Sequence, residues 1–364
     1  MRIANVVGTR PQIIKAAALQ PALREHHDEV FIDTGQHWDD GMAGSFFAEL
    51  GLRAPDRALG VGGGSAAEQT GRMLVALEST FLEIQPEAVV VYGDTNSTLA
   101  AALSAAKLGL PVAHVEAGLR SFDRRMPEEV NRVITDHLAR WNFAPTTAAV
   151  DNLAAEGVGD GVHLVGDVMR DLAARTLETV REVAALAEIA GGGLRSGGFL
   201  FATIHRAENR SPDAIRAWVG LLDSLARPER PVILALHPGT RAAMEAAGAR
   251  PGPDVTIVEP LGYRSSLAAQ LHAAAVLTDS GGIQREASWL GTPCLVLRGS
   301  TEWPETLDGD GASSVLVGLD AVHARDALDR LAPADRAPEA AATRARERSI
   351  DTDGATESIA RLLA

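Results

Sequence analysis

The segment VLTDSGGIQREASWL, residues 276–290, carries the clearest structural signal in this chain. Its first three residues end an apolar run that is typical of a buried parallel strand, and residues 279–282 are turn formers. Ile283, Ala287 and Leu290 then recur at helical spacing. The segment therefore predicts a strand, a tight glycine turn and a helix, which is the repeating unit of an α/β fold.

The glycine turn is a candidate phosphate site. The first amides of the helix that follows have no partner within the helix and lie at the positive end of its dipole. Gly281 and Gly282 have no Cβ, so a phosphate group can approach these amides beside Ser280. Glu286 follows four residues after Gly282, on a similar face, where its carboxylate can hold a sugar diol. These residues indicate a nucleotide diphosphate site, and an ordinary strand–helix turn is the alternative.

The composition favours a two-domain globular protein of the cytoplasm. At 364 residues the chain is long for one domain, and 46% of its residues are hydrophobic. The net charge of −14 argues against nucleic acid or an anionic membrane surface as a partner. We find no apolar run of membrane-spanning length and no signal peptide. Cys294 is the only cysteine, which excludes an intrachain disulfide; we expect it to be an inert residue of a core strand.

Predicted strands and helices alternate along the whole chain. We predict strands at residues 2–7, 29–33, 88–92, 111–115, 141–144, 199–203, 232–236, 255–258, 275–278 and 293–297. Helices are predicted between them, including a long one over residues 171–189. This alternation predicts two parallel sheets, each covered on both faces, that face each other across a cleft at the carboxyl ends of the strands.

Three carboxylates occupy successive crossover points of the first predicted sheet. Asp94 and Glu116 each follow a strand, and Glu128 begins the next helix. All three are expected at the ligand edge of the sheet, which suggests proton transfer. For Asp94, capping of the following helix is the alternative. We assign Glu129 to complementation of the helix dipole.

Cationic residues follow strands of the second predicted sheet. His205 and Arg206 follow one strand, and a cation there can stabilise a diphosphate beside the glycine turn. His237 follows another strand, where a role in the core or a turn is the alternative. The ten histidines form no spaced ligand set, so we expect no metal. The absence of G-x-S-x-G, and of G-x-G-x-x-G after the first strand, argues against a serine hydrolase and a nicotinamide dehydrogenase.

Nine ordered segments resemble the non-hydrolysing UDP-N-acetylglucosamine 2-epimerase family over nearly the whole chain. They are GTRPQIIK (8–15), TGQHWDDGM (34–42), YGDTNSTLA (92–100), HVEAGLRSFDRRMPEEVNR (114–132), GDVMRD (166–171), TIHRAENR (203–210), EPLGY (259–263), TDSGGIQREA (278–287) and TEWPE (301–305). The resemblance implies a GT-B fold, with two Rossmann-like domains and the sugar nucleotide between them. We place the N-terminal domain at residues 1–167, with residues 355–364 packed back on it, and the C-terminal, UDP-binding domain at residues 168–354.

The same resemblance implies a reaction and residue roles. The family inverts C2 of UDP-GlcNAc to give UDP-ManNAc, by anti elimination of UDP to 2-acetamidoglucal and re-addition, and we expect no cofactor and a homodimer. By motif match, Asp94, Glu116 and Glu128 transfer protons, and His205 interacts with the leaving diphosphate. Contacts with UDP are assigned to Arg10, Ser280, Gly281 and Gly282, and contact with ribose to Glu286. Bacterial relatives bind a second, allosteric UDP-GlcNAc, for which the candidates here are Gln36, His37, Arg72 and His237.

Two departures from the family pattern leave the substrate open. Gln12 and Trp303 stand where many members acting on UDP-GlcNAc have Glu and Arg, and both resemble the branch that acts on UDP-2,3-diacetamido-2,3-dideoxyglucuronic acid. Archaeal-type UDP-GlcNAc members, however, share SFDRRMPEE. The loop over residues 121–127 is shorter than in several bacterial members, which bears on allosteric control. The primary prediction is a UDP-GlcNAc 2-epimerase. The alternatives are the 2-epimerase of the diacetamido sugar and, from another class, a GT-B glycosyltransferase, which the three carboxylates disfavour.

Overall fold

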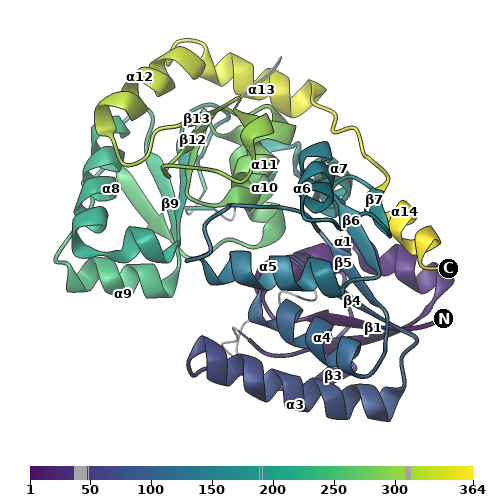
Figure 1. Cartoon of the computed structure of the whole chain (residues 1–364). Helices are drawn as coiled ribbons and strands as arrows, with labels where there is room; N and C mark the ends of the chain where they lie inside the picture. The colour runs from purple at the N-terminus through teal and green to yellow at the C-terminus, as the bar shows by residue number, and fades with distance from the viewer. Residues whose placement is uncertain (37–46, 48, 188, 191, 308–312) are drawn as a thin grey trace. The chain divides into compact units, whose positions relative to one another are not determined.

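The chain folds into two compact units, each built around one parallel β-sheet (Figure 1). The computed structural model describes residues 1–36, 47, 49–187, 189–190, 192–307 and 313–364. Unit 1 comprises Met1–Leu172 and Thr352–Ala364, and unit 2 comprises Ala173–Asp351. Among these described residues, no helix is long and apolar enough to cross a membrane.

Unit 1 contains a seven-stranded sheet with the order β3-β2-β1-β4-β5-β6-β7. Its strands are β1 (Arg2–Val7), β2 (Asp28–Asp33), β3 (Arg57–Ala58), β4 (Ala88–Tyr92), β5 (Val112–Val115), β6 (Trp141–Ala144) and β7 (Val162–Leu164). Its helices are α1 (Arg10–His26), α3 (Ala66–Ile84), α4 (Asn96–Lys107), α5 (Pro127–Leu138), α6 (Thr147–Ala155), the start of α7 (Val168–Val180) and α14 (Ala355–Leu362). The five residues of β4 are completely buried, as expected for a parallel strand covered on both faces.

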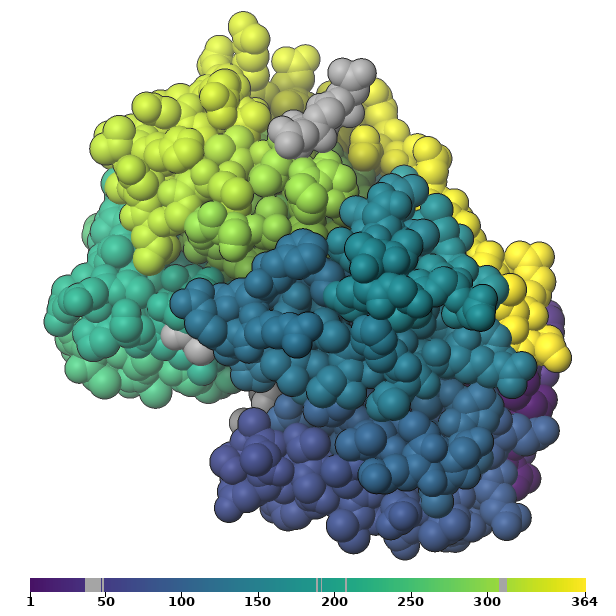
Figure 2. All heavy atoms as spheres, viewed as in Figure 1, coloured from purple at the N-terminus to yellow at the C-terminus, as the bar shows by residue number. Residues whose placement is uncertain are grey.

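The C-terminal helix α14 packs on α1 within unit 1. The Nε2 of His27, just after α1, lies 3.0 Å from the carbonyl oxygen of Ala360. Asp171 accepts hydrogen bonds from the amide and the hydroxyl of Thr356, both at 2.9 Å. Figure 2 shows the last residues of the chain, in yellow, beside the N-terminal residues, in purple. The chain therefore returns to unit 1 after it completes unit 2.

Unit 2 repeats the same topology with six strands, in the order β10-β9-β8-β11-β12-β13. The strands are β8 (Leu200–Ile204), β9 (Val232–Leu236), β10 (Val255–Val258), β11 (Ala275–Thr278), β12 (Cys294–Val296) and β13 (Ser314–Leu316). The helices are α8 (Pro212–Leu225), α9 (Pro238–Ala246), α10 (Tyr263–His272), α11 (Gly281–Leu290), α12 (Ala321–Leu331) and α13 (Ala337–Glu347).

Both faces of the unit 2 sheet are buried under helices. Leu200 and Ala202 of β8 belong to the hydrophobic cluster that contains Trp218 of α8, whereas Phe201 belongs to the cluster that contains Leu267 of α10. Successive strand residues point to opposite faces, so both faces are covered. Each sheet also reverses its strand order beside its first strand, as in Rossmann folds. The predicted fold class, α/β with two doubly wound Rossmann-like units, is confirmed.

Two other predictions of local structure have clear outcomes. Cys294 is completely buried in β12, and burial raises the pKa of its thiol to about 12, which confirms an unreactive core residue. The long helix predicted over residues 171–189 is wrong, because α7 ends at Val180 and a separate 3₁₀ turn covers Val183–Leu186. The Nε2 of His272 lies 3.1 Å from the carbonyl oxygen of Val180, and this contact from another helix takes the place of a bond that would continue α7.

Candidate active site

Two of the predicted catalytic carboxylates lie on adjacent strand ends in unit 1. Tyr92 of β4 is paired with Val115 of β5, so Asp94 and Glu116 leave the sheet at the same edge. Arg132 of α5 forms an ion pair with the Asp94 carboxylate.

The third predicted carboxylate, Glu128, is on α5. Asn131 of the same helix donates to the Asp94 carbonyl at 2.9 Å. Glu128 is exposed and precedes Asn131 and Arg132 by three and four residues, so all three share one face of the helix. The ion pair and hydrogen bond to Asp94 therefore place that face beside the strand ends.

The capping role considered for Asp94 is wrong. Thr95 is the N-cap of α4, and its hydroxyl accepts a hydrogen bond from the Thr98 amide at 3.3 Å. Asp94 instead pairs with Arg132, which lies far along the chain. The Asp94 carboxylate is therefore fixed by a cation rather than by the helix that follows it.

Glu116 is held in an unusual backbone conformation beside a lysine. Its φ is +70°, in the left-handed region that costs a non-glycine residue about 1–3 kcal/mol. The Nζ of Lys15 lies 2.8 Å from the Glu116 carboxylate, and the two side chains are only 10% and 11% exposed. A Cβ on Gly93, whose φ is +59°, would lie 3.1 Å from that Nζ. The Gly93 turn, Lys15 and Glu116 therefore form one close-packed group.

Lys15 was not among the predicted site residues. The signal in the sequence is a lysine within the apolar pattern of α1, where its side chain is nearly buried. A buried lysine needs an anionic partner, but the sequence does not say which one.

Glu129 does more than complement the α5 dipole. Its side chain is 2% exposed and accepts hydrogen bonds from the amides of Ser121 and Phe122, both at 2.9 Å. It also pairs with Arg132 at 3.2 Å. Phe122 is 78% exposed and has a φ of +58°, so the buried carboxylate holds a strained loop. Glu129 therefore stabilises this loop in addition to complementing the helix dipole.

We expect Glu129→Ala to lower the free energy of unfolding by about 3–5 kcal/mol, because it leaves two loop amides without their buried acceptor and removes one carboxylate partner of Arg132. The matched control is Glu128→Ala, one residue away on the exposed side of the same turn, which should change stability little. Urea denaturation of the two variants beside the wild type makes the measurement. Equal unfolding midpoints for both variants would contradict the structural role of Glu129.

In unit 2, Asp279 organises the residues beside the glycine turn. This carboxylate follows β11 and is completely buried. It accepts hydrogen bonds from the amides of His205 at 3.1 Å and Arg206 at 3.0 Å, and from the Asn209 side chain at 2.8 Å. Its Oδ1 also lies 3.0 Å from Nδ1 of His205. Burial alone would raise the pKa of Asp279, but the contact with His205 and these donors lower it below its ordinary value.

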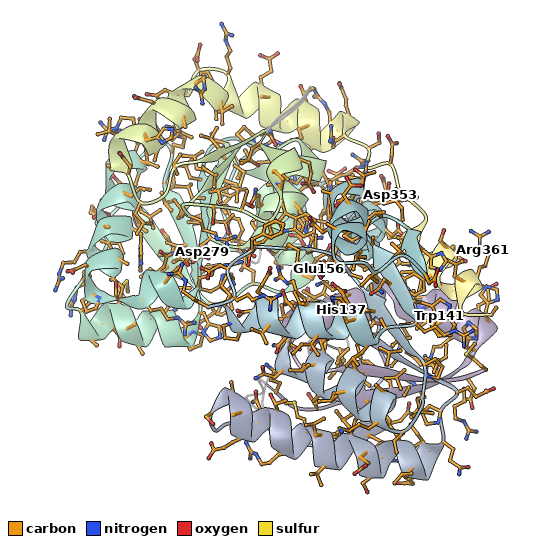
Figure 3. The ribbon with its side chains drawn as sticks, in the orientation of Figure 1. His137, Trp141, Glu156, Asp279, Asp353 and Arg361 are labelled. Carbon is orange, nitrogen blue, oxygen red and sulfur yellow. The ribbon has the colours of Figure 1, made fainter. Side chains whose placement is uncertain are left out.

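Asp279 was predicted only as a turn residue. Asp279 fixes both the backbone and the ring of His205. It therefore orients the residue that is predicted to contact the diphosphate. Figure 3 labels Asp279 within unit 2. The signal in the sequence is an aspartate directly after a buried strand, just as Asp94 follows β4 by two residues in unit 1.

The predicted glycine turn forms the start of α11. Ser280 is the N-cap, and its hydroxyl accepts a hydrogen bond from the Ile283 amide at 3.4 Å. A Cβ on Gly281 would lie 3.0 Å from Nε1 of Trp303, so close packing requires glycine there. A Cβ on Gly282 would meet only the Ser280 hydroxyl, at 3.7 Å, so its absence leaves room on that side of the turn.

Glu286 and Glu302 are buried carboxylates near this turn. Glu286 is 5% exposed and accepts a hydrogen bond from Gln270 at 2.6 Å. Glu302 accepts two hydrogen bonds from Arg298, at 2.8 and 3.0 Å, and lies 3.7 Å from Arg206. Burial opposes ionisation of Glu302, but the pairing with Arg298 and the charge of Arg206 lower its pKa to about 2. Glu302 therefore stays charged and holds two arginines on this side of unit 2.

The remaining predicted contacts have individual structural settings. Arg10 is an exposed first residue of α1. Gln36 is buried, and its side-chain oxygen accepts hydrogen bonds from the amide of Ser97 at 2.9 Å and its hydroxyl at 2.7 Å. Arg72 donates to the carbonyls of Gly62 and Gly63. His237 caps α9 by accepting a hydrogen bond from the Gly239 amide at 3.1 Å. His37 lies outside the described residues, and the allosteric assignment of this set stays a prediction.

Comparison with known proteins defines the family of this chain. Residues 21–364 match the family model of UDP-N-acetylglucosamine 2-epimerase. The chain belongs to this family. It is 42% identical over 324 residues to UDP-2,3-diacetamido-2,3-dideoxy-D-glucuronate 2-epimerase of Pseudomonas aeruginosa, covering 87% of this chain and 88% of the relative. It is 38% identical over 326 residues to UDP-N-acetylglucosamine 2-epimerase of Methanocaldococcus jannaschii, again covering 87% and 88%.

Solved structures agree with this assignment. The crystal structure of the Methanocaldococcus jannaschii UDP-GlcNAc 2-epimerase in complex with UDP-GlcNAc and UDP aligns with a TM-score of 0.86 and 36% identity, covering 100% of this chain and 99% of that one. The glycosyltransferase SnogD from Streptomyces nogalater, at 18% identity and a TM-score of 0.52, shares the fold alone. The predicted family, and with it the prediction of an isomerase, is confirmed.

Proposed function

We propose that this epimerase interconverts UDP-GlcNAc and UDP-ManNAc. The observation that carries the proposal is the meeting of Asp94, Glu116 and the Glu128 face of α5 at one sheet edge, with Lys15 and Arg132 fixing two of the carboxylates. Inversion at C2 requires a proton to leave one face of the carbon and return to the other, which a single fixed carboxylate cannot do. Several carboxylates at one edge supply separate groups for the two transfers.

The family resemblance implies an elimination and a re-addition, and we assign the proton transfers of both steps to these groups. One carboxylate removes the C2 proton, the electrons of the C2–H bond form the C1=C2 double bond, and the C1–O bond to the diphosphate breaks. The products of this step are UDP and 2-acetamidoglucal. A second carboxylate protonates C2 on the opposite face while the β-phosphate oxygen of UDP attacks C1.

We assign UDP binding to residues of unit 2. The amides at the start of α11 suit a phosphate, because they lie at the positive end of the helix and the side of Gly282 is open. Asp279 fixes Nδ1 of His205, which leaves Nε2 as the ring nitrogen for the leaving diphosphate. Glu286, one turn further along α11, is assigned to the ribose hydroxyls.

We expect Glu286→Ala to raise KM for the UDP-sugar with little change in kcat. A ribose contact is made equally in the ground state and the transition state, so its loss removes uniform binding. Steady-state kinetics and UDP titration calorimetry on the variant and the wild type provide the measurement. A large fall in kcat at unchanged KM would place Glu286 in the chemistry instead.

The 2-epimerase of UDP-2,3-diacetamido-2,3-dideoxyglucuronic acid is the second candidate. It is favoured by Gln12 and Trp303, and by the 42% identity to the Pseudomonas aeruginosa enzyme. Gln12, however, is 1% exposed, accepts from the Gly8 amide at 2.9 Å and donates to the Tyr92 carbonyl at 2.9 Å. Its role within the core of unit 1 explains the glutamine without reference to the sugar.

The experiment compares the two UDP-sugars as substrates. The purified protein is given each UDP-sugar separately, and kcat/KM is measured from product formation by NMR. A higher kcat/KM for UDP-GlcNAc supports the proposal, and a higher value for the diacetamido-glucuronate sugar overturns it in favour of the second candidate. A cytoplasmic homodimer is part of the same proposal, and sedimentation equilibrium of the purified chain tests its assembly.

A further inference from the structure

A completely buried histidine–aspartate pair, His114 and Asp136, lies behind the two strand-end turns of unit 1. His114 is in β5 and Asp136 is in α5, and both side chains are 0% exposed. Nδ1 of His114 lies 2.7 Å from Oδ1 of Asp136, and Nε2 lies 2.7 Å from the carbonyl oxygen of Gly93. Both ring nitrogens are therefore engaged, and neither has access to solvent.

The partners of the ring determine its protonation. The Gly93 carbonyl can only accept, so Nε2 must carry a proton. Asp136 is an acceptor as well, because it already receives hydrogen bonds from Arg120 at 2.7 Å and from the Gly118 amide at 3.2 Å. An acceptor on each side of the ring favours a donor at both nitrogens, which is the imidazolium form.

The charges around the pair balance when the ring is positive. Arg120 contacts Asp136 on one side and donates twice to Glu156, at 2.8 Å each. The row His114, Asp136, Arg120 and Glu156 then alternates positive and negative and has no net charge. It ends at the surface, where Nε2 of His137 lies 3.3 Å from Glu156 (Figure 3).

We propose that His114, held as an imidazolium by Asp136, is the positioning residue for the carboxylates of Asp94 and Glu116. The proposal rests on the proposed function, in which these carboxylates transfer the C2 proton. The Gly93 carbonyl that His114 holds belongs to the residue directly before Asp94. The Gly118 amide that Asp136 holds lies two residues after Glu116.

The backbone between these anchors needs such support. Gly93, Glu116 and Gly118 all have left-handed φ values, of +59°, +70° and +81°. Glycine adopts such values freely, but Glu116 persists in this conformation only where its surroundings fix it. One buried pair thus fixes both turns, and the distance between the two carboxylates depends on it.

Neutron diffraction from a perdeuterated crystal at about pH 8, where a histidine in water is neutral, tests the protonation directly. We expect deuterium on both nitrogens of His114 and none on Asp136. Deuterium on only one ring nitrogen, whether or not Asp136 also carries one, overturns the proposal. The neutron measurement needs no turnover, so its result is independent of the proposed function.

The positioning role is tested with Asp136→Asn against Asp171→Asn. Asp171 is also a buried carboxylate of unit 1, but it holds α14 through Thr356. We expect Asp136→Asn to lower kcat by about 10–100-fold with KM changed by less than about threefold, as for other residues that orient a catalytic group. Asp171→Asn should affect thermal stability alone. Equal kcat values for Asp136→Asn and the wild type overturn the positioning role. If the wild type converts neither UDP-sugar, the proposed function fails, and the neutron map still decides the state of the pair.

If Asp136→Asn folds poorly, the kcat of His114→Gln provides a second test of the positioning role. A glutamine can donate to the Gly93 carbonyl but cannot carry the charge. We expect partial activity from His114→Gln, between those of the wild type and His114→Ala, because the hydrogen bond to the turn is restored without the ion pair. Identical kcat values for His114→Gln and His114→Ala in folded protein overturn the assignment of the Gly93 hydrogen bond.

Discussion

Glu116→Gln should lower kcat for epimerisation by at least about 100-fold, and by as much as about 10,000-fold, with UDP affinity retained. The amide keeps the shape of the side chain but cannot accept a proton from carbon. It also loses the ion pair with Lys15, which lies 2.8 Å away in a nearly buried setting. UDP is assigned to unit 2, so its dissociation constant should change little. Product formation by NMR and UDP titration calorimetry measure the two quantities.

The control for this prediction is Glu78→Gln, at an exposed position of α3, which should leave both quantities unchanged. Asp94→Asn and Glu128→Gln are expected to behave like Glu116→Gln, because each removes one of the three carboxylates from the same edge. Near-normal turnover in both Glu116→Gln and Glu128→Gln would exclude the carboxylate mechanism, even with the fold and family unchanged.

Asp279→Ala is expected to lower the free energy of unfolding by about 3–5 kcal/mol. The substitution leaves two backbone amides and the Asn209 side chain without their buried acceptor. His205 also loses the partner of its Nδ1, so kcat should fall in the protein that remains folded. Urea denaturation monitored by tryptophan fluorescence suits unit 2, which contains Trp218, Trp289 and Trp303. Asp213→Ala, at an exposed aspartate of α8, is the control and should have little effect.

The same residue gives a pH dependence with a definite sign. Because the pKa of Asp279 is lower in the folded state than its ordinary value of about 3.9, its contribution to stability is fully present above that value. The contribution is lost as the pH falls through the folded pKa. The stability difference between the wild type and Asp279→Ala should therefore be constant near neutral pH and shrink in acid below about pH 4. A difference that grows in acid would contradict an ionised Asp279.

The alternation of apolar runs and glycine turns was enough to predict most of the fold. A parallel strand buried on both faces is a continuous apolar segment, so β4, β8 and β9 were located almost to the residue. The short edge strands β3, β7 and β13 were missed, because two or three residues show no periodicity. The end of α7 was also missed, since its limit depends on His272 of a distant helix.

Some residues of the candidate site could likewise be predicted from the sequence, and others could not. Carboxylates at strand ends could be predicted, because topology alone brings such positions to one edge of a parallel sheet. Their partners could not, since Lys15 and Arg132 meet them only through folding. Asp94 illustrates the difference, because its local sequence favoured a helix cap and its tertiary partner is Arg132. His114 carried no signal at all, because a histidine inside an apolar strand usually indicates a core residue.

In the proposed reaction, the C2 proton of the sugar exchanges with solvent through the carboxylates of unit 1. Incubation of the wild type with UDP-GlcNAc in deuterium oxide, followed by NMR at C2, tests it most directly. We expect deuterium at C2 of both UDP-GlcNAc and UDP-ManNAc, and we expect Glu116→Gln to lose this exchange. Formation of UDP-ManNAc that retains its original C2 hydrogen would contradict it.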